Sequence, residues 1–160
     1  MVACDQKVDP NTELAKQYLN KKGYSIVSYK GNNSYTLYRH TLINDISTWA
    51  VQSANPDKYI GKDIIEEIFI VKNHPLSTIY SSQEGFTDQV QVNVLVNHRK
   101  VIGGTSVPIG KGLQGESLSA PPYSLEGKLP GEILRKKYSE WYREWLEKYS
   151  DYKKGPITLH

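Results

Sequence analysis

The sequence predicts an α+β domain: an antiparallel sheet of about five strands with helices packed on one face. Two segments, near either end, space their apolar residues as amphipathic helices do, and one central segment alternates strictly. Two connections between expected strands are hairpins and no βαβ crossover is expected, which favours an antiparallel sheet. The expected order is helix, strand, strand, helix, strand, strand, strand, helix. A chain of 160 residues is long enough for one domain with a core of its own.

The first helix follows a flexible leader at residues 1–8. Asp9 is placed to cap this helix, and Pro10 fits its first turn, where a backbone N–H is not needed. Gly23 is placed to end it. The helix would present Leu14, Ala15, Tyr18 and Leu19 to the core.

Two strands are predicted next, over residues 24–30 and 34–39. The intervening Gly31-Asn32-Asn33 has the composition of a hairpin turn. A second helix is predicted over residues 41–53, because Leu42, Ile43, Ile46, Trp49 and Ala50 recur at helical spacing. Asn55-Pro56-Asp57 then ends it.

The central strands have the clearest patterns. Residues 64–72 are rich in β-branched side chains and stop at His74-Pro75. Residues 76–87 show no decisive pattern. Over residues 89–96 the valines share one face, which predicts a half-buried strand that turns at 97–99 and returns over 100–104.

Residues 106–131 contain four prolines and five glycines and are predicted to form a long loop, a feature that is often functional or mobile. A helix is expected over residues 132–153. Its aromatic residues recur every three or four positions, and Tyr138, Trp141 and Trp145 are expected to pack on the sheet. The single domain would span residues 9–154, with a tail at 155–160.

Composition and charge exclude several classes of protein. The net charge of +3 is weaker than the clustered excess of most nucleic-acid-binding domains, so no nucleic acid is expected as a partner. One cysteine allows no internal disulfide, and no run of apolar residues is long enough to cross a bilayer.

No catalytic, metal or cofactor site is expected. The four histidines show no metal-ligand spacing and are interpreted as solvated residues. The sequence lacks the nucleophile elbow of the α/β-hydrolases. Glu66 and Glu67 are neighbours on a strand, so their side chains should point to opposite faces of the sheet and cannot act together. The alternative is a small enzyme whose site is assembled from residues distant in sequence.

Cys4 suggests where the protein resides. It lies in Val2-Ala3-Cys4-Asp5, where small residues precede the cysteine and polar residues follow it, as at a bacterial lipoprotein cleavage site. Lipidation there would hold the chain on the extracytoplasmic face of the cell membrane. The alternative is an accidental cysteine in a disordered leader.

The aromatic helix is the best candidate for a binding element, directed at a protein or a sugar. Tyr142 and Leu146 lie outside its expected buried stripe. Together with Tyr149 and with Lys111 and Tyr123 from the long loop, they form the predicted binding surface.

Several sequence strings resemble a known family: residues 49–52 (WAVQ), 59–62 (YIGK), 69–76 (FIVKNHPL), 100–104 (KVIGG) and 123–128 (YSLEGK). They resemble, in this order, small domains of unknown function from Gram-positive bacteria that often occur on envelope lipoproteins. The resemblance covers about residues 12–130 and implies an envelope location without an activity. The leading hypothesis is therefore a lipid-anchored, non-enzymatic domain that binds a protein or a cell-wall component.

Overall fold

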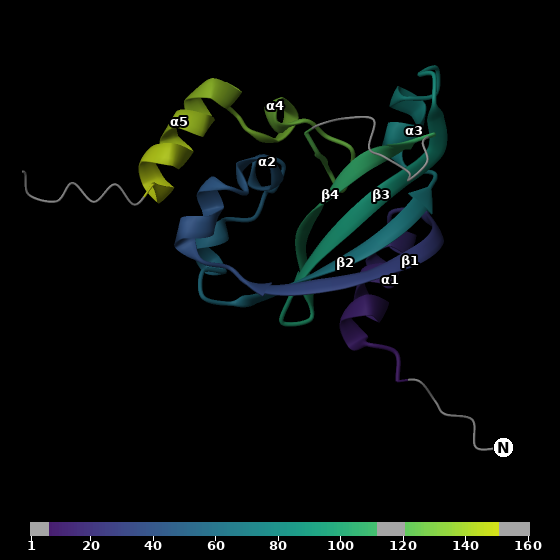
Figure 1. Cartoon of the computed structure of the whole chain (residues 1–160), viewed down its shortest axis with the longest axis horizontal. Coiled ribbons are helices and arrows are strands. Elements are labelled where there is room, and N and C mark those ends of the chain that lie inside the picture. Colours follow the sequence, from purple (N-terminus) through teal and green to yellow (C-terminus); the bar gives the residue numbers. More distant parts are fainter. Residues whose placement is uncertain (1–6, 112–120, 151–160) are drawn as a thin grey trace, which may run out of the picture.

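The computed structural model describes residues 7–111 and 121–150. Its centre is a five-stranded antiparallel sheet in the order β1-β2-β3-β4-β5, which confirms the α+β class (Figure 1). The strands are β1 (Ser25–Thr36), β2 (Asp63–Lys72), β3 (Phe86–Asn97), β4 (Lys100–Gly110) and β5 (Tyr123–Ser124). The helices are α1 (Pro10–Lys21), α2 (Ile46–Trp49), α3 (Pro75–Ile79), α4 (Pro130–Ile133) and α5 (Tyr138–Tyr149), with 3₁₀ turns η1 (Arg39–Ile43) and η2 (Pro56–Lys58).

Helix α1 begins and ends where the sequence predicts. The Asp9 carboxylate accepts a hydrogen bond from the Asn11 backbone N–H at 2.8 Å, and Pro10 occupies the first turn. Gly23 follows the helix with a φ of +84°, a conformation that glycine adopts without steric cost. The buried stripe, including Ala15 and Leu19, faces the sheet.

Strand β1 corrects the predicted hairpin over residues 24–39. It is a single strand that pairs with β2 along its whole length. Gly31 has a φ of +102°, but this geometry accompanies a register shift between Tyr29 and Gly31 and does not reverse the chain. A β-bulge and a hairpin turn both use such a glycine, so the sequence did not distinguish them.

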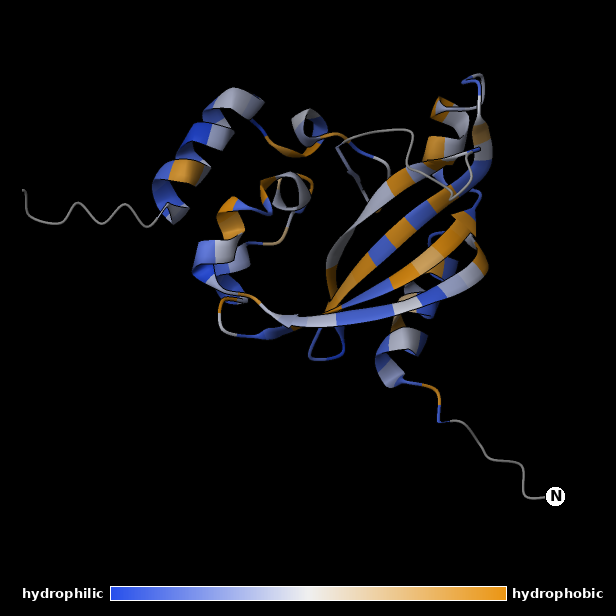
Figure 2. Ribbon diagram, in the orientation of Figure 1, coloured by the Kyte–Doolittle hydropathy of each residue, from blue (hydrophilic) through white to orange (hydrophobic). Residues whose placement is uncertain are grey.

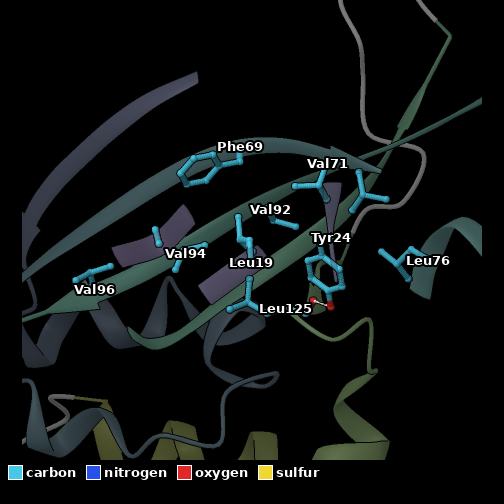
Figure 3. Close-up of a cluster of buried hydrophobic side chains, with 11 residues drawn as sticks. Leu19, Tyr24, Phe69, Val71, Leu76, Val92, Val94, Val96 and Leu125 are labelled. Atoms are coloured by element: carbon cyan, nitrogen blue, oxygen red, sulfur yellow. Dashed lines mark hydrogen bonds between the residues drawn. The ribbon is translucent and has the colours of Figure 1, made fainter. Parts of the chain in front are cut away.

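The hairpin of β3 and β4 confirms the clearest prediction. The alternation along these strands is visible in Figure 2, and Val90, Val92, Val94 and Val96 are all fully buried. They pack with Leu19 of α1 and with Phe69 of β2 in the first core (Figure 3). In the same core, the Tyr24 hydroxyl donates a hydrogen bond to the Leu125 carbonyl at 2.8 Å.

A second core lies on the opposite face of the sheet, where Ile64, Leu95 and Ile102 point away from the valines. The expectation of helices on one face is therefore wrong, since α1 covers one face and the segment after β1 covers the other. The helix predicted over 41–53 is divided into η1 and α2 by Asn44 and Asp45. Both residue types compete with helical hydrogen bonding, yet the predicted apolar residues Leu42, Ile46 and Trp49 are buried.

The long loop predicted over 106–131 is shorter in the structure. Strand β4 continues to Gly110, and residues 123–124 form β5 beside it. Pro108 does not interrupt β4, since it pairs with Val90 within the hairpin. Residues 112–120 lie outside the described part of the chain.

The predicted helix over 132–153 is also divided, into α4 and α5, with residues 134–137 between them. Helix α5 packs mainly against η1 and only partly against the sheet. Trp145 is buried, Trp141 is half-buried, and Tyr138 is exposed, which corrects its placement in the core. Residues 151–153 of the prediction are outside the described residues.

His74 corrects the interpretation of all four histidines as solvated residues. Its ring is buried, with Nδ1 accepting a hydrogen bond from the Leu76 N–H and Nε2 lying 2.8 Å from the Leu125 carbonyl. Nε2 therefore carries the proton. Ser106 lies 2.9 Å from the same nitrogen, but no lone pair is available there to activate its hydroxyl, and Ser106 is itself fully buried. The arrangement fastens α3 to the segment after β5.

His74 should make the fold sensitive to acid. Burial lowers the pKa of His74 from 6.5 to about 4, so the unfolded chain binds a proton between these values that the folded chain does not. The free energy of unfolding should have its full value above pH 6.5 and fall by about 3 kcal/mol as the pH drops to 4. Urea unfolding across this range, compared between wild type and His74→Gln, isolates the effect. An equal pH dependence of the free energy of unfolding in the two proteins would refute this prediction. His98→Gln, in the exposed hairpin turn, is the control.

Candidate functional site

All three tryptophans of the chain line one cleft, hereafter the tryptophan cleft. Its volume is about 280 Å³, and it lies between α5 and the segment that connects α2 to η2. The lining contains equal numbers of aromatic residues and of polar or charged residues. It consists of Trp49, Gln52, Ala54, Asn55, Pro56, Leu134, Trp141, Glu144, Trp145, Lys148 and Tyr149.

Helix α5 supplies one aromatic wall of the cleft. Trp145 is fixed by a hydrogen bond from its indole N–H to the Leu42 carbonyl at 2.9 Å. Its ring lies between those of Trp141 and Tyr149, at centroid distances of 4.9 Å and 4.5 Å. This spacing follows from side chains three or four residues apart on a helix. Trp141 is the least buried member of this wall and offers part of its ring to a ligand.

The opposite wall is held rigidly to the sheet by Gln52. Its side-chain amide donates to the Gly104 carbonyl at 2.7 Å and accepts from the Gly104 N–H at 2.8 Å. A Cβ atom at Gly103 would lie 2.1 Å from the Gln52 oxygen, so a larger residue there would displace the Gln52 side chain. The wall is therefore preorganised before a ligand binds.

Charged groups at the rim of the cleft are paired with each other. Lys148 forms an ion pair with Asp57 at 2.6 Å, and the Tyr149 hydroxyl donates to the same carboxylate at 2.7 Å. These two partners hold the pKa of Asp57 below its usual range. Glu144 pairs with Lys136. The cleft therefore offers aromatic surface and hydrogen-bonding groups without an unpaired charge at its rim.

Trp49 also forms one wall of a second cavity, hereafter the carboxylate pocket. Tyr35, Asp45, Thr48, Trp49 and Glu66 line this pocket, whose volume is about 260 Å³. Asp45 occupies the position that precedes α2, but its side chain does not cap that helix. Within the described residues, its carboxylate forms no hydrogen bond and no ion pair.

The carboxylate pocket disfavours negative charge. Burial raises the pKa of Glu66, and nearby Asp45 adds to the rise, although hydrogen bonds from Asn33 and Asn93 oppose it. Burial likewise raises the pKa of Asp45. Burial and the two acidic neighbours raise the pKa of Tyr35 to about 12. Such perturbed groups in a cavity are typical of functional sites.

Glu67 lies on the opposite face of the sheet from Glu66, as the sequence predicts. It is fully buried, and it accepts hydrogen bonds from Tyr29 at 2.6 Å, Thr12 at 3.0 Å and Asn32 at 3.3 Å. Neighbouring side chains therefore satisfy the hydrogen bonds of the Glu67 carboxylate. The acidic residue that lines the same pocket as Glu66 is Asp45.

The structure does not bring the predicted binding surface together. Tyr142 is exposed and Leu146 is half-buried on α5, but Tyr149 is only 1% exposed and belongs to the second core. Lys111 is exposed just beyond β4, and the Tyr123 hydroxyl lies 2.6 Å from that of Tyr80. Only Tyr149 lines the tryptophan cleft. Tyr149 faces Asp57 and Arg39 of η1 instead of solvent.

Sequence reasoning missed Trp49, Asp45 and Glu66 as site residues. Trp49 matches the spacing of a core helix, and the carboxylates near Glu66 in the sequence, Asp63 and Glu67, are not the one that shares its pocket. The signal available was the presence of three tryptophans, but their proximity depends on α5 folding back over η1.

The lipidation prediction falls on Cys4, which is outside the described residues. No helix among the described residues is long and apolar enough to cross a membrane. The same residues contain no group of three or more His, Cys, Asp or Glu side chains that is placed to hold a metal ion.

Comparison of the chain with protein-family models, with curated proteins and with solved structures finds no match. The resemblance to small envelope domains therefore stays a prediction, and the function has to be argued from the two cavities.

Proposed function

We propose that the chain is a non-enzymatic binding domain of the Gram-positive cell envelope, anchored by lipid on Cys4, that binds a wall saccharide in the tryptophan cleft. The observation that carries this proposal is the convergence of all three tryptophans on one cleft. The sequence features that favour anchoring are the residues around Cys4 and the resemblance to envelope domains.

A saccharide fits the chemistry of the cleft better than a charged ligand. The flat apolar faces of sugar rings pack on indole rings, and their hydroxyls hydrogen-bond to polar side chains at the edges. Asn55 supplies an amide group at the edge of the cleft, whereas the Gln52 amide is already bonded to Gly104 and to the Thr48 carbonyl. Because the rim charges at Lys148 and Glu144 already have partners, a neutral ligand displaces no ion pair.

Ligand binding can be tested through tryptophan fluorescence, since every tryptophan lines the cleft. Oligosaccharides released from bacterial cell wall should change the emission in a saturable way. Trp141→Ala should weaken binding by about tenfold or more, because it removes the accessible ring. Tyr142→Ala, next to it on the same helix but outside the cleft, is the matched control. Unchanged emission at saturating saccharide, or equal effects of the two variants, would refute the proposal.

Anchoring is tested separately. The full-length precursor expressed in a Gram-positive host should appear in the membrane fraction, and Cys4→Ser should release it or block its processing. Two acyl chains suffice for stable attachment, since each buried CH₂ contributes about 0.8 kcal/mol. Equal membrane fractions for wild type and Cys4→Ser would contradict the anchor while leaving the saccharide site untouched.

A second candidate function is an enzyme that acts in the carboxylate pocket. The observation in its favour is that Asp45 and Glu66, distant in sequence, face one cavity with raised pKa values. A protonated Glu66 would serve as a general acid, with Asp45 as the base. Hydrolysis of wall saccharides that is lost in both Asp45→Asn and Glu66→Gln would favour this candidate over the binding domain.

Glu66→Gln should also stabilise the fold at neutral pH. The folded chain keeps a proton on Glu66 at pH values where the unfolded chain has lost it, so the charged form costs stability as the pH rises above 4.5. We expect the free energy of unfolding to rise at pH 7, because glutamine carries no charge that burial would penalise. The gain should vanish below pH 4.5. Thermal unfolding at the two pH values measures it, and a loss of stability at pH 7 would show that Glu66 is structural.

A further inference from the structure

We propose that the surface around the start of α1 binds an anionic bilayer. This surface, hereafter the anchor face, comprises Lys7, Val8, Lys16, Tyr29, Lys62, His98 and Arg99. The inference rests on the proposed anchoring at Cys4 and adds a second, electrostatic contact with the same membrane.

Two open cavities gather these residues into two groups, one on each side of the first turn of α1. One, of about 550 Å³, is lined by Lys7, Val8, Asp9, Thr12, Lys16, Tyr29 and Asn32. The other, of about 480 Å³, is lined by Asn11, Ser34, Gly61, Lys62, Asp63, Ile65, Val96, Asn97, His98 and Arg99. They flank the first turn of α1, since Asn11 lines one and Asp9 and Thr12 line the other. Figure 1 shows the start of α1 and the turn between β3 and β4 at the same lower side of the molecule.

The anchor face carries positive charge that is not neutralised by ion pairs. The two cavities hold four basic side chains, from Lys7, Lys16, Lys62 and Arg99, and two acidic ones. None of the four basic side chains forms an ion pair within the described residues. The two carboxylates make local hydrogen bonds instead, Asp9 to the α1 backbone and Asp63 to the Thr36 hydroxyl.

Apolar side chains lie among these charges. Val8 is 59% exposed and Tyr29 is 40% exposed, although the Tyr29 hydroxyl is fixed by Glu67. Basic residues together with an exposed tyrosine and an aliphatic side chain are the combination that suits the headgroup region of a bilayer. A soluble polyanion would use the charges but not the apolar side chains.

The length of the tether brings this face to the membrane. Only two residues lie between Cys4 and Lys7, and the three steps along the chain correspond to at most about 10 Å of extended chain. Electrostatic attraction to a charged surface acts over about 8 Å at physiological ionic strength. A lipid on Cys4 therefore keeps Lys7, at the edge of this face, close to the distance over which anionic headgroups attract basic side chains. Helix α5, which supplies one wall of the tryptophan cleft, lies at the upper side of Figure 1, away from the start of α1.

The test uses the full chain with Cys4→Ser, which has no acyl group, and vesicles of phosphatidylcholine with or without phosphatidylglycerol. The protein should sediment with the anionic vesicles only, and salt should weaken the binding. Lys62→Glu combined with Arg99→Glu should lower the partition coefficient about 25-fold or more, since each basic residue near an anionic surface contributes about fivefold. The matched control is Lys128→Glu with Arg135→Glu, which makes the same charge change at exposed positions on either side of α4.

Three results would overturn the anchor face: no binding to anionic vesicles, equal losses in the two double variants, or binding to soluble polyphosphate without binding to vesicles. Circular dichroism establishes that both double variants are folded. Because the protein in this test has no lipid, its failure leaves the role of Cys4 to be decided by membrane fractionation, and the two proposals fail independently.

Discussion

Replacing Val92 by aspartate should lower the free energy of unfolding by about 3–5 kcal/mol, which is enough to unfold a marginal domain. Val92 is fully buried at the centre of β3, where it contacts the first core between α1 and the sheet. A carboxylate there would lose its hydration, and no basic side chain belongs to that core. Chemical denaturation followed by circular dichroism measures the change.

Val27→Asp is the matched control, because Val27 lies in edge strand β1 and is 47% exposed. The same chemical change should cost less than about 1 kcal/mol at this exposed position. Similar losses at the two positions would mean that strand β3 does not direct its valines into the core.

Trp145→Ala should destabilise the fold by about 3–5 kcal/mol, the usual cost of removing a large buried aromatic side chain. Trp145 is only 7% exposed, and its ring contacts both Trp141 and Tyr149. The substitution removes these contacts, leaves a cavity and deprives the Leu42 carbonyl of its donor. Because α5 is held to η1 largely through this residue, the helix should detach before the sheet unfolds.

Two variants separate packing from hydrogen bonding at this position. Trp145→Phe keeps a ring but loses the bond to Leu42, and should cost about 1–2 kcal/mol. Tyr142→Ala, at an exposed position, should lower the free energy of unfolding only slightly.

The native protein should emit blue-shifted fluorescence that iodide quenches poorly, apart from the contribution of Trp141. Efficient quenching of all three tryptophans would show that α5 stands away from the domain.

Local sequence patterns correctly predicted those elements for which the pattern is compatible with a single structure. The strict alternation along β3 identified a half-buried strand, and Asp9, Pro10 and Gly23 identified both ends of α1. The failures came from residues that serve two purposes. Gly31 suits a turn as well as a bulge, and the pairing of β1 with β2 along its full length depends on contacts that are distant in sequence.

The site was less predictable than the fold, because it is assembled from segments that meet only in three dimensions. Helical spacing assigned Tyr138, Trp141 and Trp145 to a buried stripe, which is correct for Trp145 but not for Tyr138, and Tyr149, assigned to the binding surface, is buried as well. The spacing carried no information that Trp49, almost a hundred residues earlier, would face them. The carboxylate pocket likewise requires η1 and α2 to bring Asp45 opposite β2.

The bulged geometry of β1 also bears on self-association. A long outer strand exposes a row of backbone N–H and C=O groups that can recruit a strand from another molecule, which is the first step of aggregation. In β1, register shifts at Ile26/Ser28 and Tyr29/Gly31 interrupt that row, and the charged Lys30 lies exposed at the second of them. Molecules anchored to a membrane as proposed would meet at high local concentration. This interruption of the sheet edge should then keep β1 of one copy from pairing with a strand of another.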